Sequence, residues 1–275
     1  MMPSFESLFG KDRDITIGAI HFPPLLGYPD FPGFDTALEN ALADLKAFED
    51  GGADAVIIEN NYDIPHKSPV DPEIVVSMAY LAGKMAGAAK VPIGVSVLWN
   101  DYRAALSLAK AYGLRFVRVP VFVDTVKTSY GIFEGNPKDV TDFRKRIGAD
   151  DVLLLTDIHV KHSEMISPYT IEESARMAIG EGSDALIVTG RWTGDAPGSS
   201  DLKMARGSAG DFPILCGSGM DEANIAELYK AANGSIVSTS VKIGLKDSGE
   251  TNMKPYSSRV DREKVKALVS KIESR

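Results

Sequence analysis

The histidines of this chain gather at one kind of position. Each falls at or just after the C-terminal end of an apolar run with β-strand composition: His21, His66, His159 and His162. Imidazole titrates near neutral pH and is the most common proton donor or acceptor in catalysis. The C-terminal ends of the strands carry the active site in α/β barrels, so this placement predicts an active site there. The alternative is that strand ends and loops are simply where polar residues lie.

The segment TDIHVKHSE at 156–164 carries the densest set of titratable groups. Asp157, His159 and Lys161 alternate along the chain, so they share one face while the strand stays extended. Asp157 would then lie deepest and could orient His159. Lys161, at the rim, could hold an anion or, if desolvated, form a Schiff base. His162 would face the other way. A buried ion pair filling the barrel is the structural alternative.

Glu59 closes the buried run AVIIE. A carboxylate there must find a partner, bind a metal or hold a raised pKa, which would suit a general acid or base. Arg118, inside FVRVPVF, is the expected counter-charge for Glu59 or Asp157, and that pair could be purely structural. Two prolines follow His21 and set the direction of its loop. Asn100 closes the third apolar run and is a further candidate pocket residue.

A phosphate site is predicted by CGSGM at 216–220 and by STS at the end of the next apolar run. Glycines let backbone amides approach an anion, and a helix expected from residue 221 would add its dipole. Loops after the seventh and eighth strands hold phosphate in many barrels. The expected phosphate-binding residues are Gly190, Gly217, Ser218, Gly219, Thr239 and Ser240, with Lys242 as a nearby charge. A tight turn with polar barrel filling is the alternative.

The sequence leaves two further questions open: the role of the loop 190–200 and the need for a metal. Residues 190–200, GRWTGDAPGSS, could form a lid that carries Arg191 and Trp192, or Trp192 could be packed wall. No required cofactor is expected. A divalent metal is an alternative, although the chain has no HxH or HExxH spacing of the kind that binds metals. Its ligands would come from Glu59, Asp63, Asp157, His159 and His162.

Eight short runs rich in Val, Ile and Leu are typical of parallel strands buried on both faces. They span residues 15–20, 55–59, 93–98, 116–122, 151–158, 185–190, 213–217 and 235–240. Amphipathic helical stretches separate them, for example 36–52 and 71–90. The connections leaving the strands are longer than those entering them. This pattern predicts a single-domain α/β protein over 1–275, a (β/α)8 TIM barrel with its site at the C-terminal ends of the strands.

Composition narrows the classes of partner. The chain has 275 residues and a net charge of −8, which argues against nucleic-acid binding because that needs a basic stripe. No apolar stretch reaches the roughly 18 residues that span a bilayer, and the first residues lack the order of a signal peptide. The single cysteine, Cys216, lies in an apolar run and predicts a core position and a reducing compartment. A cytoplasmic protein is expected.

Several segments, in this order, resemble the BtpA family: HFPPLLG, GGADAVIIENNYDIP, VSVLWND, RFVRVPVF, TDIHVKH, ALIVTGRWTG, CGSGM and IVSTSVK. The resemblance implies a ribulose-phosphate-binding type of TIM barrel. It also implies a role either as a nucleosidase-like enzyme or in photosystem I biogenesis, and neither label identifies a reaction. Two loops depart from the family's pattern, VDTVKTSYGIFEGN at 123–136 and GETNMKPYSSRVD at 249–261. Both would shape the pocket, so substrate specificity does not carry over.

Together these observations favour an enzyme acting on a small phosphorylated sugar or nucleotide-like substrate, of lyase, nucleosidase or isomerase type. Glu59 would be the general acid or base, with His159, oriented by Asp157, as its partner. Lys161 would stabilise developing negative charge or the phosphate. The alternatives are a non-catalytic assembly factor for membrane complexes, which would present an apolar surface patch, and a ligand sensor. A homo-oligomer is expected.

Overall fold

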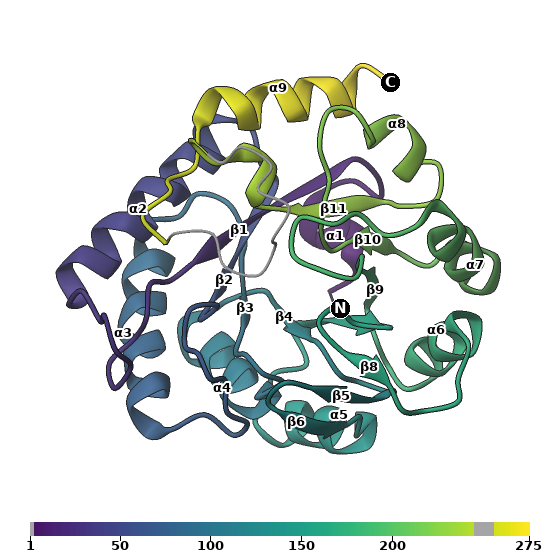
Figure 1. Ribbon diagram of the computed structural model, residues 1–275, viewed down its shortest axis with the longest axis horizontal. Coiled ribbons are helices and arrows are strands. Elements are labelled where there is room, and N and C mark those ends of the chain that lie inside the picture. Colours follow the sequence, from purple (N-terminus) through teal and green to yellow (C-terminus); the bar gives the residue numbers. More distant parts are fainter. Residues whose placement is uncertain (1–2, 245–255) are drawn as a thin grey trace.

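A closed barrel of eight parallel strands forms the centre of the computed structural model, which describes residues 3–244 and 256–275 (Figure 1). Around the barrel the order is β1 (Ile15–His21), β11 (Gly234–Val237), β10 (Ile214–Cys216), β9 (Ala185–Val188), β7 (Leu153–Ile158), β4 (Phe116–Val119), β3 (Ile93–Ser96) and β2 (Ala55–Glu59). The predicted TIM barrel is confirmed. Several strands end two or three residues earlier than predicted, so residues 97–98, 120–122 and 189–190 belong to the loops of the site.

Helices surround the barrel and follow its strands in the expected alternation (Figure 1). They are α2 (Phe34–Asp50), α3 (Pro72–Ala88), α4 (Tyr102–Tyr112), α5 (Pro137–Arg146), α6 (Ile171–Gly180), α7 (Ser199–Ala209), α8 (Ile225–Leu228) and α9 (Arg262–Glu273). The helix expected from residue 221 is reduced to the four residues of α8. Over residues 3–244 and 256–275, no helix combines the length and apolar character that crossing a membrane requires.

Side chains that point into the barrel follow the two-residue period of a strand. In β1 the buried inner positions are Ile15, Ile17 and Ala19, and the next residue of that series is His21. Ala55 and Ile57 of β2 lead in the same way to Glu59. In β4, Phe116 leads to Arg118, and in β7 Leu153 and Leu155 lead to Asp157. The interior is therefore apolar through most of its depth and ionisable at its C-terminal end.

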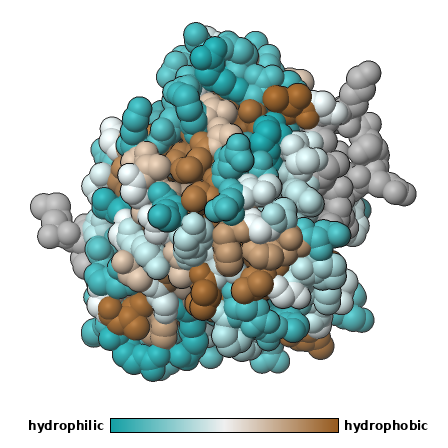
Figure 2. All heavy atoms as spheres, turned by 90° about the vertical axis from the view of Figure 1, so that its left-hand side faces the viewer, coloured by the Kyte–Doolittle hydropathy of each residue, from teal (hydrophilic) through white to brown (hydrophobic). Residues whose placement is uncertain are grey.

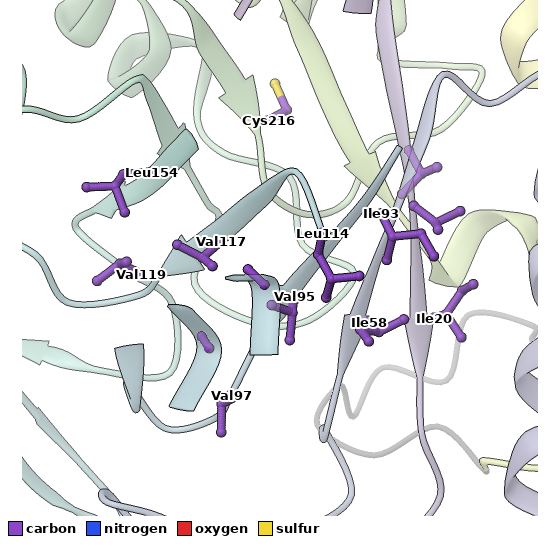
Figure 3. Close-up of a cluster of buried hydrophobic side chains, with 14 of the residues drawn as sticks. Ile20, Ile58, Ile93, Val95, Val97, Leu114, Val117, Val119, Leu154 and Cys216 are labelled. Carbon is purple, nitrogen blue, oxygen red and sulfur yellow. The ribbon is translucent and has the colours of Figure 1, made fainter. Parts of the chain in front are cut away.

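The alternate side chains of the same strands pack outward against the helices. Figure 3 shows this layer, with Ile20, Ile58, Val95, Val117 and Cys216 among its members. Cys216 is fully buried there, so its predicted core position is confirmed, and burial raises the pKa of its thiol to about 12.

A short helix that the sequence analysis did not anticipate covers the N-terminal end of the barrel. In α1 (Phe5–Phe9) the Ser4 side chain caps the helix, which ends at Gly10 in a left-handed conformation. Phe5 is buried, and Phe9 packs at 6.2 Å from the ring of Phe116 inside the barrel. This end is therefore filled by apolar side chains.

A small antiparallel sheet stands over the C-terminal side of the barrel, where only loops were expected. It pairs β5 (Thr125–Thr128) with β6 (Gly131–Glu134) and with β8 (Glu164–Met165), and lies in the lower right of Figure 1. The departing loop at 123–136 is thus mostly a hairpin. Of the other departing loop, 249–261, residues 249–255 lie outside the described part of the chain.

Candidate active site

Arg118 is the centre of the ionisable layer. Its Nε and one terminal nitrogen donate to the two oxygens of Asp157, each at 2.8 Å, and its other terminal nitrogen donates to Glu59 Oε1 at 3.2 Å. All three side chains are almost completely buried. The expectation of a counter-charge for Glu59 or Asp157 is met by both carboxylates. Asp157, whose side chain is 0% exposed, serves this bidentate pair.

Glu59 has His21 as its second partner. The two residues are paired in register between β2 and β1, and His21 Nε2 lies 3.4 Å from Glu59 Oε2. Burial alone would raise the pKa of Glu59, but the hydrogen bond with His21 and the positive charges of Arg118 and Lys161 lower it to about 2. Of the three outcomes expected for this carboxylate, the structure shows a partnered, ionised group. Burial lowers the pKa of His21, so its ring is neutral at pH 7.

Lys161 reaches the same layer from the loop after β7. Its backbone N–H donates to Thr189 Oγ1 at 2.8 Å, which fixes the chain at this point. Burial and then the charge of Arg118 lower the pKa of its amine to about 8, against the opposing effect of Glu59 and Asp157. A large fraction of Lys161 is therefore the neutral, nucleophilic amine at slightly alkaline pH.

Replacing Lys161 with methionine is expected to raise the free energy of unfolding at pH 7, because it removes a desolvated ammonium. The pKa in the folded protein, about 8, lies below the ordinary value of 10.5. Between these values the unfolded chain binds more protons, so the wild-type protein gains stability as the pH rises. The advantage of the variant should therefore be largest below pH 8 and decrease toward pH 10.5.

Urea unfolding at pH 7 and at pH 9.5 measures this difference. Lys161→Arg, which keeps a positive charge, is the matched control and should show no such gain. If Lys161→Met were less stable than the wild type at pH 7, the lysine would be a stabilising ion-pair partner and this interpretation would be wrong.

His159 does not join the cluster, contrary to the expectation from its spacing. The strand ends at Ile158, and His159 adopts a left-handed conformation with φ of 51°. Its N–H donates to Asp124 Oδ2 at 3.0 Å, and its ring Nε2 lies 3.2 Å from the carbonyl of Tyr169. Because Asp157 is engaged by Arg118, the predicted orientation of His159 by Asp157 is wrong. His21 takes the place beside Glu59 that was expected of His159.

Two cavities open onto this layer. One, of about 100 Å³, is bounded by the turn at 217–221 and by residues 236–240. The other, of about 470 Å³, is bounded by the loops after β2, β3, β4 and β7. Both are lined by the same five residues, His21, Glu59, Arg118, Lys161 and Thr193. A ligand occupying both cavities would pass directly over the ionisable groups.

The smaller cavity contains most of the predicted phosphate-binding residues. Its lining includes Gly217, Ser218, Gly219, Thr239 and Ser240, and the hydroxyl of Ser240 is buried without a hydrogen-bond partner. A helix dipole contributes little here, because α8 is four residues long and starts at residue 225. Anion recognition would depend on backbone amides and hydroxyls.

Two of the predicted phosphate residues also hold the loop 190–198. Ser218 Oγ accepts from the N–H of Gly190 and donates to the carbonyl of Asp195. Gly219 has φ of +63°, and a Cβ there would lie 2.1 Å from the nitrogen of Ala196. Gly190 lies in a separate open cavity of about 880 Å³ rather than at the turn. The close packing of this loop therefore requires glycine at positions 190 and 219, whether or not phosphate binds.

The larger cavity has an aromatic wall that the sequence analysis largely missed. Trp99 and Tyr130 line it together with His66 and Trp192, and the ring of His66 packs edge-on against Tyr130 at 5.0 Å. His66 Nδ1 is buried without a hydrogen-bond partner, and burial lowers the pKa of His66 to about 4. The position of His66 after β2 was noted, but Trp99 and Tyr130 carry no local signal of function.

His162 and the loop 190–200 close part of this cavity. His162 Nε2 lies 2.9 Å from Thr193 Oγ1, and its ring packs on Trp192 with centroids 5.5 Å apart. Burial, followed by the charges of Lys161 and Arg118, lowers the pKa of His162 to about 4. Trp192 is thus a cavity wall that remains partly exposed.

The remaining predicted pocket residues are dispersed. Asn100 exchanges two hydrogen bonds with the backbone of Val121, each at 2.9 Å, and so joins two loops instead of facing a ligand. Arg191 is exposed beside the 880 Å³ cavity. Lys242 is buried next to a cavity of about 10 Å³ that His21 also lines.

The structure does not bring the five candidate metal ligands together. Asp63 accepts from the N–H of Leu25 and from Asn60, while the other four have the partners described above. Among residues 3–244 and 256–275, no group of three or more His, Cys, Asp or Glu side chains has the arrangement of a metal site.

Comparison of the sequence with known proteins identifies a family that this chain matches. The sequence model of the BtpA family matches residues 12–274. The photosystem I biogenesis protein BtpA of Synechocystis sp. is 35% identical over 229 residues, which cover 82% of this chain and 79% of that protein. An uncharacterised protein of Pyrococcus furiosus is 35% identical over 238 residues, covering 84% and 89%. A tryptophan synthase structure from M. tuberculosis superposes with a TM-score of 0.58 at 14% identity, covering 98% and 95%, which is a likeness of fold.

Proposed function

The chain belongs to the BtpA family, and from this premise and the geometry of the barrel mouth we propose that it is an enzyme acting on a small phosphorylated substrate by acid–base chemistry. One observation carries the proposal. A small polar cavity and a larger aromatic one are lined by the same His21, Glu59, Arg118 and Lys161. A substrate with an anionic end and a larger organic part fits this division.

The phosphate is assigned to the smaller cavity. Its binding groups are the backbone amides of Ser218 and Gly219 and the hydroxyls of Thr239 and Ser240, since the N–H of Gly217 donates to the carbonyl of Val188. The unpaired hydroxyl of Ser240 supports the assignment, since a buried polar group without a partner costs about 1–3 kcal/mol unless a ligand satisfies it. Lys161 adds a positive charge at the inner end of this cavity.

The proton-transfer groups are Glu59 and His21. Glu59 is ionised, so it can accept a proton but has none to give; its pKa of about 2 makes it a weak base by itself, and it acts as the base together with the adjacent His21. His21 is neutral and adjacent, so it can hold or pass on the proton. Arg118 keeps Glu59 in place and charged, and Lys161 stabilises negative charge that develops on the substrate. Bond cleavage and isomerisation both fit this set.

Thermal-shift measurements test the phosphate assignment with inorganic phosphate, pentose phosphates and nucleoside monophosphates. A ligand at 100 times its Kd stabilises the folded state by about 2.7 kcal/mol. We expect stabilisation by at least one of these compounds, and a loss of most of it in the double variant Thr239→Val, Ser240→Ala. The ligand-free variant should be as stable as the wild type, because Ser240 Oγ has no partner to lose. No shift with any of them would contradict the phosphate site.

A second candidate function is assembly of a membrane complex, because the Synechocystis relative is named for photosystem I biogenesis. Figure 2 looks onto the side of the molecule where α2 and α3 lie and shows apolar groups separated by hydrophilic ones. Val76 and Tyr80 of α3 are 62% and 39% exposed, and Tyr80 packs on Phe34. This role needs the surface rather than the ionisable layer, so it predicts no stabilisation by phosphate compounds.

A further inference from the structure

Lys161 is shared by three cavities of the barrel mouth. Lys161 lines the 100 Å³, the 470 Å³ and the 880 Å³ cavities. Among the described residues its amine has no hydrogen-bond or ion-pair partner, although its backbone is anchored to Thr189. A lysine that served only the fold would be expected to bind a carboxylate or carbonyl group.

The neighbouring charges are already engaged with one another. Both oxygens of Asp157 accept from Arg118, and Glu59 is shared between Arg118 and His21. His162, on the other side, is neutral and bonded to Thr193. Lys161 therefore faces a fixed positive guanidinium without a carboxylate of its own, which favours its neutral form.

We propose that Lys161 is a nucleophile that forms a Schiff base with the carbonyl carbon of the substrate, so that the substrate is a phosphorylated aldehyde or ketone. This inference rests on the proposed function for the phosphate and defines the rest of the molecule. The carbonyl would lie where the two cavities meet, with the phosphate on the turn at 217–219 and the remaining carbon chain toward Trp99 and Tyr130.

The step balances without an external oxidant or reductant. The lone pair of Nζ forms the new C–N bond while the carbonyl π pair moves to oxygen, which takes up the proton that leaves the nitrogen. The carbinolamine hydroxyl then departs as water, after receiving a proton, and the nitrogen lone pair forms the C=N bond. Overall an ammonium and a carbonyl give an iminium and water. Glu59 and His21 are the neighbouring groups that can relay the proton.

Lys242 offers a matched control. Burial lowers its pKa to about 8 as well, with Asp44 and Arg259 as its charged neighbours. Its cavity of about 10 Å³ is too small for a carbonyl compound. A comparison of the two lysines therefore separates the effect of an accessible cavity from that of a lowered pKa.

The experiment is borohydride trapping followed by peptide mass spectrometry. The intact protein is incubated with glyceraldehyde 3-phosphate or with glycolaldehyde, which has no phosphate, and sodium borohydride then reduces any iminium to a stable secondary amine. We expect the adduct on Lys161 in the wild type and in Lys242→Arg, and its loss in Lys161→Arg. The yield on Lys161 should rise with pH through about 8, whereas surface lysines should react mainly near pH 10 or above.

The outcomes separate this inference from the proposed function. Trapping of Lys161 by glycolaldehyde without any phosphate-dependent stabilisation would support the nucleophile and contradict the phosphate site. Stabilisation by phosphate compounds with no adduct on Lys161 from either aldehyde would overturn the nucleophile and leave Lys161 as an electrostatic group. Equal labelling of Lys161 and Lys242 would also overturn it, because the cavity would then make no difference.

Discussion

Replacing Arg118 with methionine is expected to lower the free energy of unfolding by about 3–5 kcal/mol, because it leaves two buried carboxylates without their counter-charge. Arg118 supplies three hydrogen bonds to Glu59 and Asp157, and all three side chains are at most 6% exposed. Methionine fills similar space without charge. The loss in free energy of unfolding therefore comes mainly from the unpaired carboxylates rather than from an empty cavity.

Urea unfolding of a double-mutant cycle with Asp157→Asn measures this effect. The double variant should be more stable than the sum of the single changes predicts, since the unpaired charge of Asp157 is gone. The difference in free energy of unfolding between the wild type and Arg118→Met should also become smaller as the pH falls. In the wild type, Glu59 stabilises the fold above its ordinary pKa of 4.5 and loses this effect toward pH 2, while the unpaired carboxylates of the variant gain from protonation. A loss below about 1 kcal/mol at pH 7 would mean that the pair is nearly neutral for stability.

The ionisable layer was predictable to the extent that the period of a strand determines it. Glu59 follows Ala55 and Ile57, and Asp157 follows Leu153 and Leu155, at two-residue spacing. Since the strands are parallel, the inner residues at their C-terminal ends meet in one layer. Glu59, Asp157 and Arg118 could therefore be expected to be neighbours before any distance was known.

The prediction fails where the backbone leaves the extended conformation. His159 and His162 have φ of 51° and 60°, so the alternation that holds through Asp157 no longer decides which way a side chain points. The turn is held by Asp124, a residue 35 positions earlier that accepts from the N–H of His159. Such a contact depends on tertiary packing and leaves no local signal in the sequence.

Other differences did leave signals. TVKT and GIFE, separated by Ser129 and Tyr130, have the two-residue connection of a hairpin and form β5 and β6. At the start of the chain, Ser4 and Gly10 are a typical cap and stop for α1. Both segments change the site, because the hairpin contributes Tyr130 to the larger cavity and α1 closes the other end of the barrel.

Replacing Glu59 with glutamine is expected to lower kcat by about 10²–10⁴, the usual contribution of a general base. Glutamine keeps the size of the side chain and can still contact Arg118 and His21, but it cannot accept a proton. The assay is ³¹P NMR of the phosphorylated compound that gives the largest thermal shift, with phosphate binding measured in parallel. Binding should change little, because Glu59 lies at the inner end of the smaller cavity and the phosphate groups are Thr239, Ser240 and the turn.

Asp157→Asn is the control that separates chemistry from structure. Asp157 shares Arg118 with Glu59, yet its side chain is 0% exposed and lines none of the three cavities that Lys161 reaches. We expect this variant to lose stability while kcat falls by less than about tenfold, an effect smaller than the contribution of a general base. If kcat fell by the same factor in Asp157→Asn and in Glu59→Gln, displacement of Arg118 would explain the loss and Glu59 would not be the base. Wild-type turnover in Glu59→Gln would contradict the assignment directly and leave Lys161 and His21 as the groups that carry the reaction.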